Sequence, residues 1–227
     1  MLLSGMLGDA SLWDGVAARI GARVLPWAAR IDLDDSVPAM AASVLAQAPP
    51  RFALGGHSLG AIVALEVLRQ EPGRVTRLAL VNASARGPAA AQQHAWARLR
   101  QRTAAGEFDQ VAAELARSAL AAPRRGDEAA VAAGVRMAHS VGAAGFLRQL
   151  AAQSARPDSR ASLAAIPVPV LVVSGELDEV CPPALQRELA ALCPRAELAS
   201  VEGGGHMLPL ECPAALAGLL LDWLASS

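Results

Sequence analysis

The sequence predicts an α/β protein with a mostly parallel central sheet flanked by helices. Strand-like and helix-like segments alternate before residue 87 and again after residue 166. Strands that alternate with helices of this length are joined by right-handed crossovers, which makes the strands parallel. The intervening residues 87–166 are helix-like throughout. We therefore expect a core formed by residues 1–86 and 167–227, with residues 87–166 inserted as a helical cap.

The first expected elements surround a loop that contains two glycines. Residues 2–3 read as a short apolar strand, and Asp9 or Ser11 is a candidate N-cap for a helix over residues 12–20. A second strand is expected over residues 23–27. Its proline cannot donate to a central ladder, so this strand is expected at a sheet edge or at a strand end.

The next elements are a helix, a strand, a helix and a strand. Apolar residues at helical spacing predict a helix over residues 36–48, and two prolines end it. An apolar strand over residues 51–57 leads directly into a helix over residues 59–70. A strand over residues 75–81 completes the part of the core that precedes the insertion.

The same sequence signals predict the elements of the inserted segment and of the last part of the chain. Helical character in the insertion is interrupted at residues 123–127 and 155–158, where proline stands beside charged residues. After the insertion, the expected elements are a strand over residues 169–173, a helix over 183–192, a strand over 197–201 and a helix over 214–224.

The composition of the chain disfavours several classes of binding partner. The chain has 227 residues, of which 53% are hydrophobic, and this is ample for a sizeable core. Its net charge is -1, and charges of both signs are scattered, which disfavours nucleic acid and anionic membrane surfaces as partners. We expect no signal peptide and no membrane span, and therefore a cytoplasmic protein. The oligomeric state stays open, with a homodimer as one option.

Residue types that are scarce or absent exclude several chemistries. The three cysteines are odd in number and lack a Cys-x-x-Cys spacing, which favours reduced thiols over a disulfide framework. Lysine is absent, so a P-loop lysine and a Schiff-base lysine are both excluded. No cluster of histidine, cysteine and acidic residues has metal-ligand spacing. We expect neither a metal nor a cofactor.

Residues 56–60 read Gly-His-Ser-Leu-Gly, between an apolar strand-like run and a helix-like run. A strand, a sharp turn and a helix in this order hold a serine nucleophile away from the backbone. The strand and the helix cross closely at the turn, which leaves little room for a Cβ at Gly56 and Gly60. Ser58 is expected to adopt a positive φ.

A serine nucleophile needs a histidine base and a carboxylate that orients the histidine. Of four histidines, His206 follows the last predicted strand after three glycines, which indicates a loop that bends freely to place one side chain. The loop after the preceding strand offers Glu176, Asp178 and Glu179, and Asp178 is favoured because the turn leaves it near the carboxyl edge of the sheet. Asn82 occupies the other position from which an acid could come, at the end of the fourth strand.

These features resemble the α/β-hydrolase superfamily, and within it the capped carboxylesterase and lactonase-like group. The resemblance covers nearly the whole chain. It rests on the Gly56–Gly60 turn, on the order Ser58, Asp178, His206, and on the segments 2–6 and 209–213.

The resemblance implies a function and an architecture. It implies a serine hydrolase that cleaves a carboxylic ester or related acyl bond through Ser58, His206 and Asp178, by way of an acyl-enzyme. The backbone N–H groups of Met6 and Leu59 would form the oxyanion hole. We expect the sheet to lack the two strands that usually precede the first strand in this family, and Ser4 stands where many relatives have histidine.

The cap is expected to choose the substrate, and its apolar residues suggest an uncharged acyl or aromatic group. We expect Phe146, Met137, Leu150 and His139 to bind the substrate. His139 and Arg156 could bind a substrate carboxylate or could cap helices.

Several alternatives stay open. The same three residues could serve a lactonase, a thioesterase, a carbon–carbon bond hydrolase or a lyase. A hydrolase-fold binding protein without turnover is the alternative from another class. A dinucleotide fingerprint fails on glycine spacing, and a dehalogenase of this fold would need aspartate at position 58.

Overall fold

In the computed structural model of the protein, residues 1–21 and 28–225 are described. The strand predicted over residues 23–27 lies outside the described residues. Its immediate successor, β2 (Ala28–Ala29), is a short strand at one edge of the sheet.

The described strands form one six-stranded parallel sheet in the order β2-β1-β3-β4-β5-β6. The remaining strands are β1 (Leu2–Leu3), β3 (Phe52–His57), β4 (Val75–Val81), β5 (Val170–Gly175) and β6 (Ala196–Val201). The chain moves outward from β1 to β2 and then returns to pair β3 on the other side of β1. The carboxyl ends of β1 and β3 therefore flank the point where the strand order reverses, where ligands bind in open α/β sheets.

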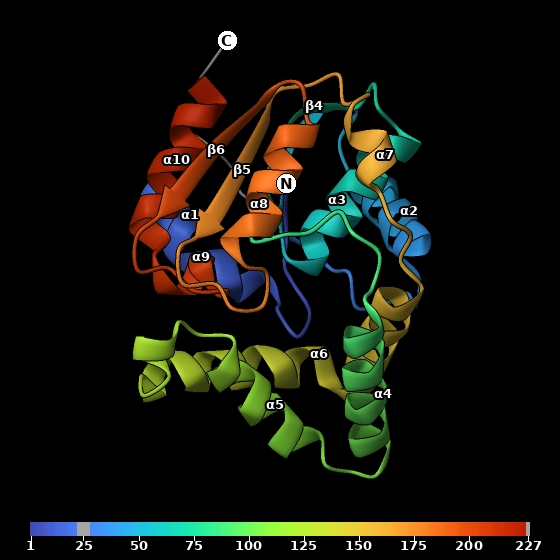
Figure 1. The fold of residues 1–227 in the computed structure, drawn as a ribbon, viewed down its shortest axis with the longest axis vertical. Helices are drawn as coiled ribbons and strands as arrows, with labels where there is room; N and C mark the ends of the chain where they lie inside the picture. The colour runs from blue at the N-terminus through green and yellow to red at the C-terminus, as the bar shows by residue number, and fades with distance from the viewer. Residues whose placement is uncertain (22–27, 226–227) are drawn as a thin grey trace.

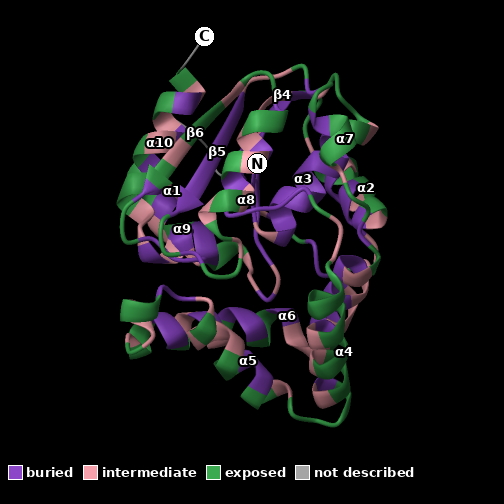
Figure 2. Cartoon of the chain, viewed as in Figure 1, coloured by how far each residue is buried: buried purple, intermediate pink, exposed green. Residues whose placement is uncertain are grey.

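Helices cover both faces of this sheet (Figure 1). One face is covered by α2 (Val37–Gln47), α3 (Leu59–Gln70) and α8 (Pro183–Leu192). The other is covered by the 3₁₀ helix η1 (Ala10–Trp13), α1 (Asp14–Ile20), α9 (Leu208–Glu211) and α10 (Pro213–Ala225). Strand β5, between β4 and β6, is buried along its whole length, which is why residues 170–173 are a continuous apolar run (Figure 2). This is the α/β architecture that the sequence predicts.

The segment between β4 and β5 is mostly helical. It contains α4 (Ala90–Ala104), α5 (Phe108–Ser118), the 3₁₀ helix η3 (Ala122–Arg124), α6 (Glu128–Ala155) and α7 (Arg160–Leu163). In Figure 1, α4, α5 and α6 lie together beyond one end of the sheet. They share an apolar cluster that includes Trp96, Val111 and Phe146 and reaches Leu7 in the loop after β1. The division of the chain into a core and a cap domain stays a prediction.

Two glycines interrupt the helical segment between β4 and β5 at positions that were not predicted from the sequence. Gly106, with φ +89°, lies between α4 and α5. Gly142, with φ 72° and ψ 166°, breaks α6 into two helical stretches. Both conformations are open to glycine and strained for other residues. The interruptions predicted at 123–127 and 155–158 are present, at η3 and at the end of α6.

One helix, α6, is long and apolar enough to cross a membrane by length and composition alone. Such a segment was not expected from the sequence. Two features favour a helix of a folded domain: the non-helical geometry at Gly142, and the packing of its buried side chains against α4 and α5.

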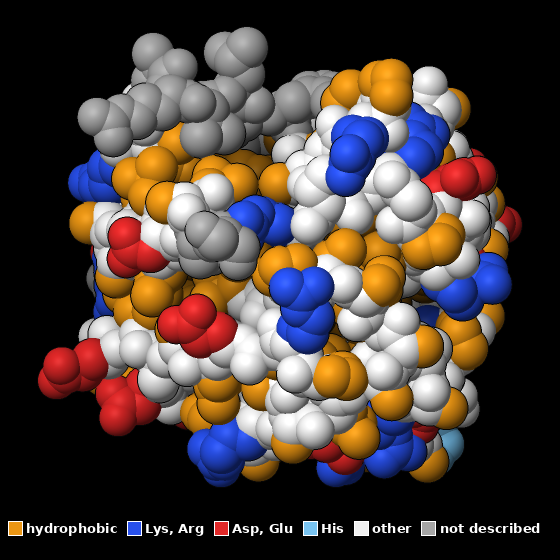
Figure 3. All heavy atoms as spheres, turned by 90° about the horizontal axis from the view of Figure 1, so that it is seen from above, with side chains coloured by type: hydrophobic (Ala, Val, Ile, Leu, Met, Phe, Trp, Pro, Cys, Tyr) orange, Lys and Arg blue, Asp and Glu red, His pale blue; other side chains and the backbone are white. Residues whose placement is uncertain are grey.

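The charged side chains visible on the face in Figure 3 are of both signs and lie scattered among apolar ones.

Candidate active site

The turn between β3 and α3 presents Ser58 in the conformation that the sequence predicts. Ser58 has φ 52° and ψ -118°, and its backbone N–H donates to the carbonyl of Val81 at 3.0 Å. A Cβ on Gly56 would lie 2.4 Å from the Gly60 carbonyl oxygen, and one on Gly60 would lie 2.3 Å from the Leu3 carbonyl oxygen. The two glycines therefore allow α3 to cross β3 and the end of β1 at close range.

His206 lies between Ser58 and Asp178. Its Nε2 is 3.0 Å from the Ser58 Oγ, and its Nδ1 is 2.9 Å from the Asp178 Oδ2. A carboxylate can only accept, so Nδ1 carries a hydrogen, and Nε2 is left to accept from the serine hydroxyl. This is the arrangement in which a histidine can remove the serine proton.

Asp178 is held by its own loop. Its Oδ1 accepts the backbone N–H groups of Val180 and Cys181, both at 2.8 Å, which leaves Oδ2 for His206. Asp178 is 3% exposed. Glu176 is exposed, and Glu179 pairs with Arg125 at 2.6 Å. Of the three acidic residues in this loop, only Asp178 contacts His206 in the described part of the chain.

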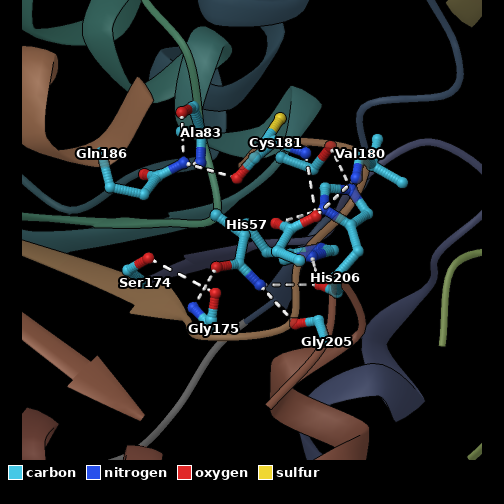
Figure 4. A network of polar contacts seen from close by, with 12 residues as sticks. His57, Ala83, Ser174, Gly175, Val180, Cys181, Gln186, Gly205 and His206 are labelled. Atoms are coloured by element: carbon cyan, nitrogen blue, oxygen red, sulfur yellow. Dashed lines mark hydrogen bonds and ion pairs between the residues drawn. The ribbon is translucent and has the colours of Figure 1, made fainter. Parts of the chain in front are cut away.

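Two further side chains fix the backbone around His206. The Nδ2 of Asn82 donates to the carbonyls of Gly205 at 2.8 Å and His206 at 2.9 Å, and its Oδ1 accepts the N–H of Gly175 at 2.7 Å. The Nε2 of His57 donates to the His206 carbonyl at 2.7 Å (Figure 4). Burial, aided by the charge of His206, lowers the pKa of His57 to about 3, so its ring is neutral near neutral pH.

The role of Asn82 was not predicted from the sequence. The residue was noted only because it is not an acid at the end of the fourth strand. An amide at that position offers both a donor and acceptor, and this was the signal that could have found it.

The three glycines before His206 serve packing more than flexibility. Only Gly203, with φ +69°, needs a backbone conformation that favours glycine. A Cβ on Gly204 would lie 2.3 Å from Leu208 Cδ1, and a Cβ on Gly205 would lie 2.3 Å from the Ala121 nitrogen. The loop therefore lies pressed between α9 and the segment before η3, which corrects the expectation of a freely bending loop.

A cavity of about 360 Å³ opens at Ser58 and His206. Its walls come from the loop after β1, the end of β4, and helices α4, α5 and α6. Met6, one of the two predicted oxyanion-hole residues, lines it. Leu59, the other, is the first residue of α3, so its N–H belongs to the group that has no acceptor within the helix. A Cβ on Gly5 would lie 3.0 Å from the Ser58 Cβ, so the loop after β1 packs directly on the serine.

The four predicted substrate-binding residues lie in different environments. Met137 lines the cavity. Phe146 and Leu150 are fully buried in the apolar cluster of α4, α5 and α6 and are not among the lining residues. His139 is exposed on α6, where its Nε2 is 3.1 Å from the Asp109 Oδ1. Arg156, which the sequence analysis weighed as a ligand for a carboxylate, does line the cavity.

The described residues contain no group of three or more histidine, cysteine or acidic side chains that could hold a metal ion. The three cysteines are free thiols. Burial raises the pKa of Cys181 to about 12 and that of Cys193 to about 11. These thiols are protonated near neutral pH, so neither is a nucleophile there.

The chain is similar to known hydrolases over nearly its whole length. Residues 2–219 match the model of the alpha/beta hydrolase family. "Putative carbamate hydrolase RutD" of Variovorax paradoxus (strain S110) is 32% identical in an alignment 246 residues long, and the alignment covers 99% of this chain and 91% of that protein. The protein of the same name from Escherichia coli O7:K1 is 31% identical over 203 residues, covering 85% of this chain and 74% of its own.

Solved structures share the fold. A thermophilic esterase from Thermogutta terrifontis, in a malate-bound form, superposes with a TM-score of 0.85 at 22% identity, covering 98% of this chain and 88% of that one. The enol-lactonase from Burkholderia xenovorans LB400 gives a TM-score of 0.83 at 20% identity, with 99% and 91% covered. Together with the family match over residues 2–219, these similarities assign the chain to the α/β-hydrolase family, and it is a hydrolase.

Proposed function

We propose that this hydrolase cleaves a carboxylic ester or a related acyl bond, with Ser58 as nucleophile, His206 as general base and acid, and Asp178 as the residue that orients His206. The single observation that carries the proposal is the pair of contacts at His206, 3.0 Å to Ser58 Oγ and 2.9 Å to Asp178 Oδ2. A histidine bonded on both sides in this way can pass a proton between serine and a leaving group.

In the first half of the reaction, Ser58 Oγ attacks the carbonyl carbon and His206 Nε2 takes the hydroxyl proton. The negative charge that develops on the carbonyl oxygen would be met by the backbone N–H groups of Leu59 and Met6. Removing one such donor typically costs about 2.7–4 kcal/mol of transition-state stabilisation. The tetrahedral intermediate then collapses, His206 gives its proton to the leaving alcohol, and Ser58 retains the acyl group.

In the second half, a water molecule gives a proton to His206 Nε2 and its oxygen attacks the acyl carbon. Collapse of this intermediate returns the proton to Ser58 Oγ and releases the carboxylic acid. Asp178 keeps its negative charge throughout and stabilises the imidazolium form of His206 each time it appears. The cycle needs only groups of this chain and water.

Carbamate hydrolysis is the second candidate. It is favoured by the similarity to two proteins that carry the name "Putative carbamate hydrolase RutD", one of them over 99% of this chain. A carbamate carbonyl is attacked in the same manner as an ester carbonyl, so the same three side chains would serve. The two candidates differ only in which leaving group and acyl group the cavity accepts.

Ser58→Ala tests the proposal. We expect the variant to fold as the parent does, because Ser58 lies at the surface of the cavity and the change removes one hydroxyl. Hydrolysis of 4-nitrophenyl esters should fall by at least three orders of magnitude, and a fluorophosphonate should label the parent but not the variant. Activity within tenfold of the parent would contradict the assignment of the nucleophile.

A substrate panel then separates the candidates. Esters of increasing acyl length, a lactone, a thioester and an N-unsubstituted carbamate are compared by kcat/KM with the parent and Ser58→Ala. Failure of the parent to label and to turn over any of them would favour the ligand-binding protein without catalysis.

A further inference from the structure

We propose that Arg156 binds a carboxylate of the substrate, so that the preferred substrate is an acyl compound with an apolar chain and a second, anionic carboxylate away from the scissile bond. This inference rests on the proposed hydrolysis at Ser58 and names its substrate class. It replaces the expectation of an uncharged acyl group.

Arg156 is a cation buried among neutral groups. It is 7% exposed, at the C-cap of α6. Its Nε donates to the Arg86 carbonyl at 3.1 Å and its Nη1 to the Gln153 Oε1 at 2.5 Å, and the guanidinium lies 5.1 Å from the centre of the Trp96 ring. Within the described part of the chain, no carboxylate pairs with it and its Nη2 makes no hydrogen bond.

Burial of an unpaired cation is unfavourable, because water stabilises the charge better than neutral dipoles do. Burial lowers the pKa of Arg156, in keeping with this cost. Arginine stays charged in proteins nonetheless. The buried guanidinium is therefore an electrostatic site that an anion would complete, and its planar fork suits a carboxylate.

The cavity has the charge that such a ligand requires. Arg86 and Arg156 both line it, and its described lining contains no aspartate or glutamate. Arg86 is neutralised outside the cavity by Glu188, which it contacts at 2.7 and 2.9 Å. Arg156 is left as the uncompensated charge at the same cavity that holds Ser58.

The other walls suit an apolar chain. Met6, Leu7, Leu115 and Met137 contribute aliphatic or thioether surface, and two alanines on α5 add smaller apolar side chains. A substrate with a reactive carbonyl at Ser58, an apolar chain and a terminal carboxylate at Arg156 would satisfy both kinds of wall. At about 360 Å³, the cavity has the size of a small-molecule site.

A purely structural role for Arg156 is the competing explanation. Its bond to the Arg86 carbonyl joins the end of α6 to the segment after β4, and its bond to Gln153 stays within the last turn of α6. Such a role predicts that loss of the guanidinium affects neutral and anionic substrates alike. Only binding of the anion predicts a change in the ratio of kcat/KM for anionic substrates to kcat/KM for neutral substrates.

The test compares matched neutral and anionic esters. The acyl arm uses monoethyl and diethyl esters of butanedioic, pentanedioic and hexanedioic acids, and the alcohol arm uses 4-acetoxybutanoate and its ethyl ester. Parent, Arg156→Gln, Arg156→Lys and Arg160→Gln are assayed by acid release at pH 7.5. Arg160 is a matched control, because it is partly exposed, pairs with Asp158 and does not line the cavity.

We expect the parent to prefer the anionic ester in at least one arm. Arg156→Gln should lower kcat/KM for that ester by roughly 10- to 100-fold while the neutral ester changes by less than about threefold, since a bond to a charged group is lost. Arg156→Lys should keep part of the preference, and Arg160→Gln should keep all of it. A parent without preference, or an equal loss on both esters in Arg156→Gln, would overturn the inference.

A binding measurement separates this inference from the proposed catalysis. Hexanedioate should raise the Tm of the parent and of Ser58→Ala, but not that of Arg156→Gln. Fluorophosphonate labelling of Ser58 at the parent's rate in Arg156→Gln shows that the catalytic residues are intact. If the parent neither labels nor hydrolyses esters, the proposed function fails, and the Tm shift alone still decides whether Arg156 binds a carboxylate.

Discussion

Asn82 shows how one buried amide can fix the geometry of residues far apart in sequence. It has φ 48° and is fully buried, and it bonds the last residue of β5 as well as the loop that carries His206. Asp178 lies in the loop that begins directly after this end of β5. The distance between the proposed acid and base therefore depends on a side chain that bonds only to backbone groups of these segments, which makes Asn82 a positioning residue.

Asn82→Ala should lower activity through this geometry. Loss of the amide leaves the buried carbonyl of Gly205 and the N–H of Gly175 without partners, at about 1–3 kcal/mol for each unsatisfied group, while the His206 carbonyl keeps only its bond from His57. We expect kcat to fall more than tenfold with KM changed little, together with slower fluorophosphonate labelling and a lower Tm. Asn82→Asp is the matched variant, because it keeps the acceptor for Gly175 and loses the donors. A kcat equal to the parent's in both would refute the positioning role.

The residues of the proposed catalytic group were open to prediction because their chemistry is marked in the sequence. Glycines on both sides of Ser58, and a loop position after a strand for Asp178 and His206, identify them without coordinates. The residues that line the cavity could not be predicted in the same way. Met137 and Phe146 are nine residues apart, about two and a half helical turns, so a regular helix would place them on opposite sides. Gly142 interrupts the helix between them as well.

At the scale of elements, α6 contributes side chains both to the cavity and to the apolar cluster that it shares with α4 and α5. The residues before Gly142 include Met137, which is 2% exposed and lines the cavity. The residues after it include Phe146, which is fully buried against Phe108, with ring centres 6.1 Å apart. The strands and core helices were predicted because apolar periodicity specifies them. The break in α6 was not, because an isolated glycine is compatible with a continuous helix.

Two truncations in α6 should separate these two contributions. Met137→Ala should shift the preferred acyl length, since one side chain contact in a pocket changes selectivity by about 10- to 200-fold. Phe146→Ala should instead destabilise the protein by about 3–5 kcal/mol, because it leaves a cavity in the cluster of α4, α5 and α6. Urea unfolding and kcat/KM over 4-nitrophenyl esters measure both. A change of acyl preference in Phe146→Ala alone would reverse the assignment.

For the whole molecule, the burial of His57 connects folding with pH. The pKa of His57 is lowered to about 3 in the folded protein, whereas an unperturbed histidine titrates near 6.5. Between these values the unfolded chain binds the extra proton and the folded chain does not. Stability therefore rises with pH across this window and is lost as the pH falls from about 6.5 towards 3. His206 adds to the effect, because its positive charge opposes protonation of the neighbouring ring.

His57→Gln should remove this part of the acid sensitivity while its side-chain amide can still donate to the His206 carbonyl. Each pH unit between the two pKa values corresponds to about 1.4 kcal/mol. From pH 7.5 to 4.5, the stability of the variant relative to the parent should thus increase by about 2–3 kcal/mol, whatever its value at pH 7.5. Urea unfolding at intervals across this range measures the difference, with His94→Gln, on an exposed position of α4, as the control. Removal of a histidine that stays neutral in the folded protein should change the slope of the free energy of unfolding against pH. Equal slopes for His57→Gln and the parent would therefore show that the acid sensitivity of the fold originates at other groups.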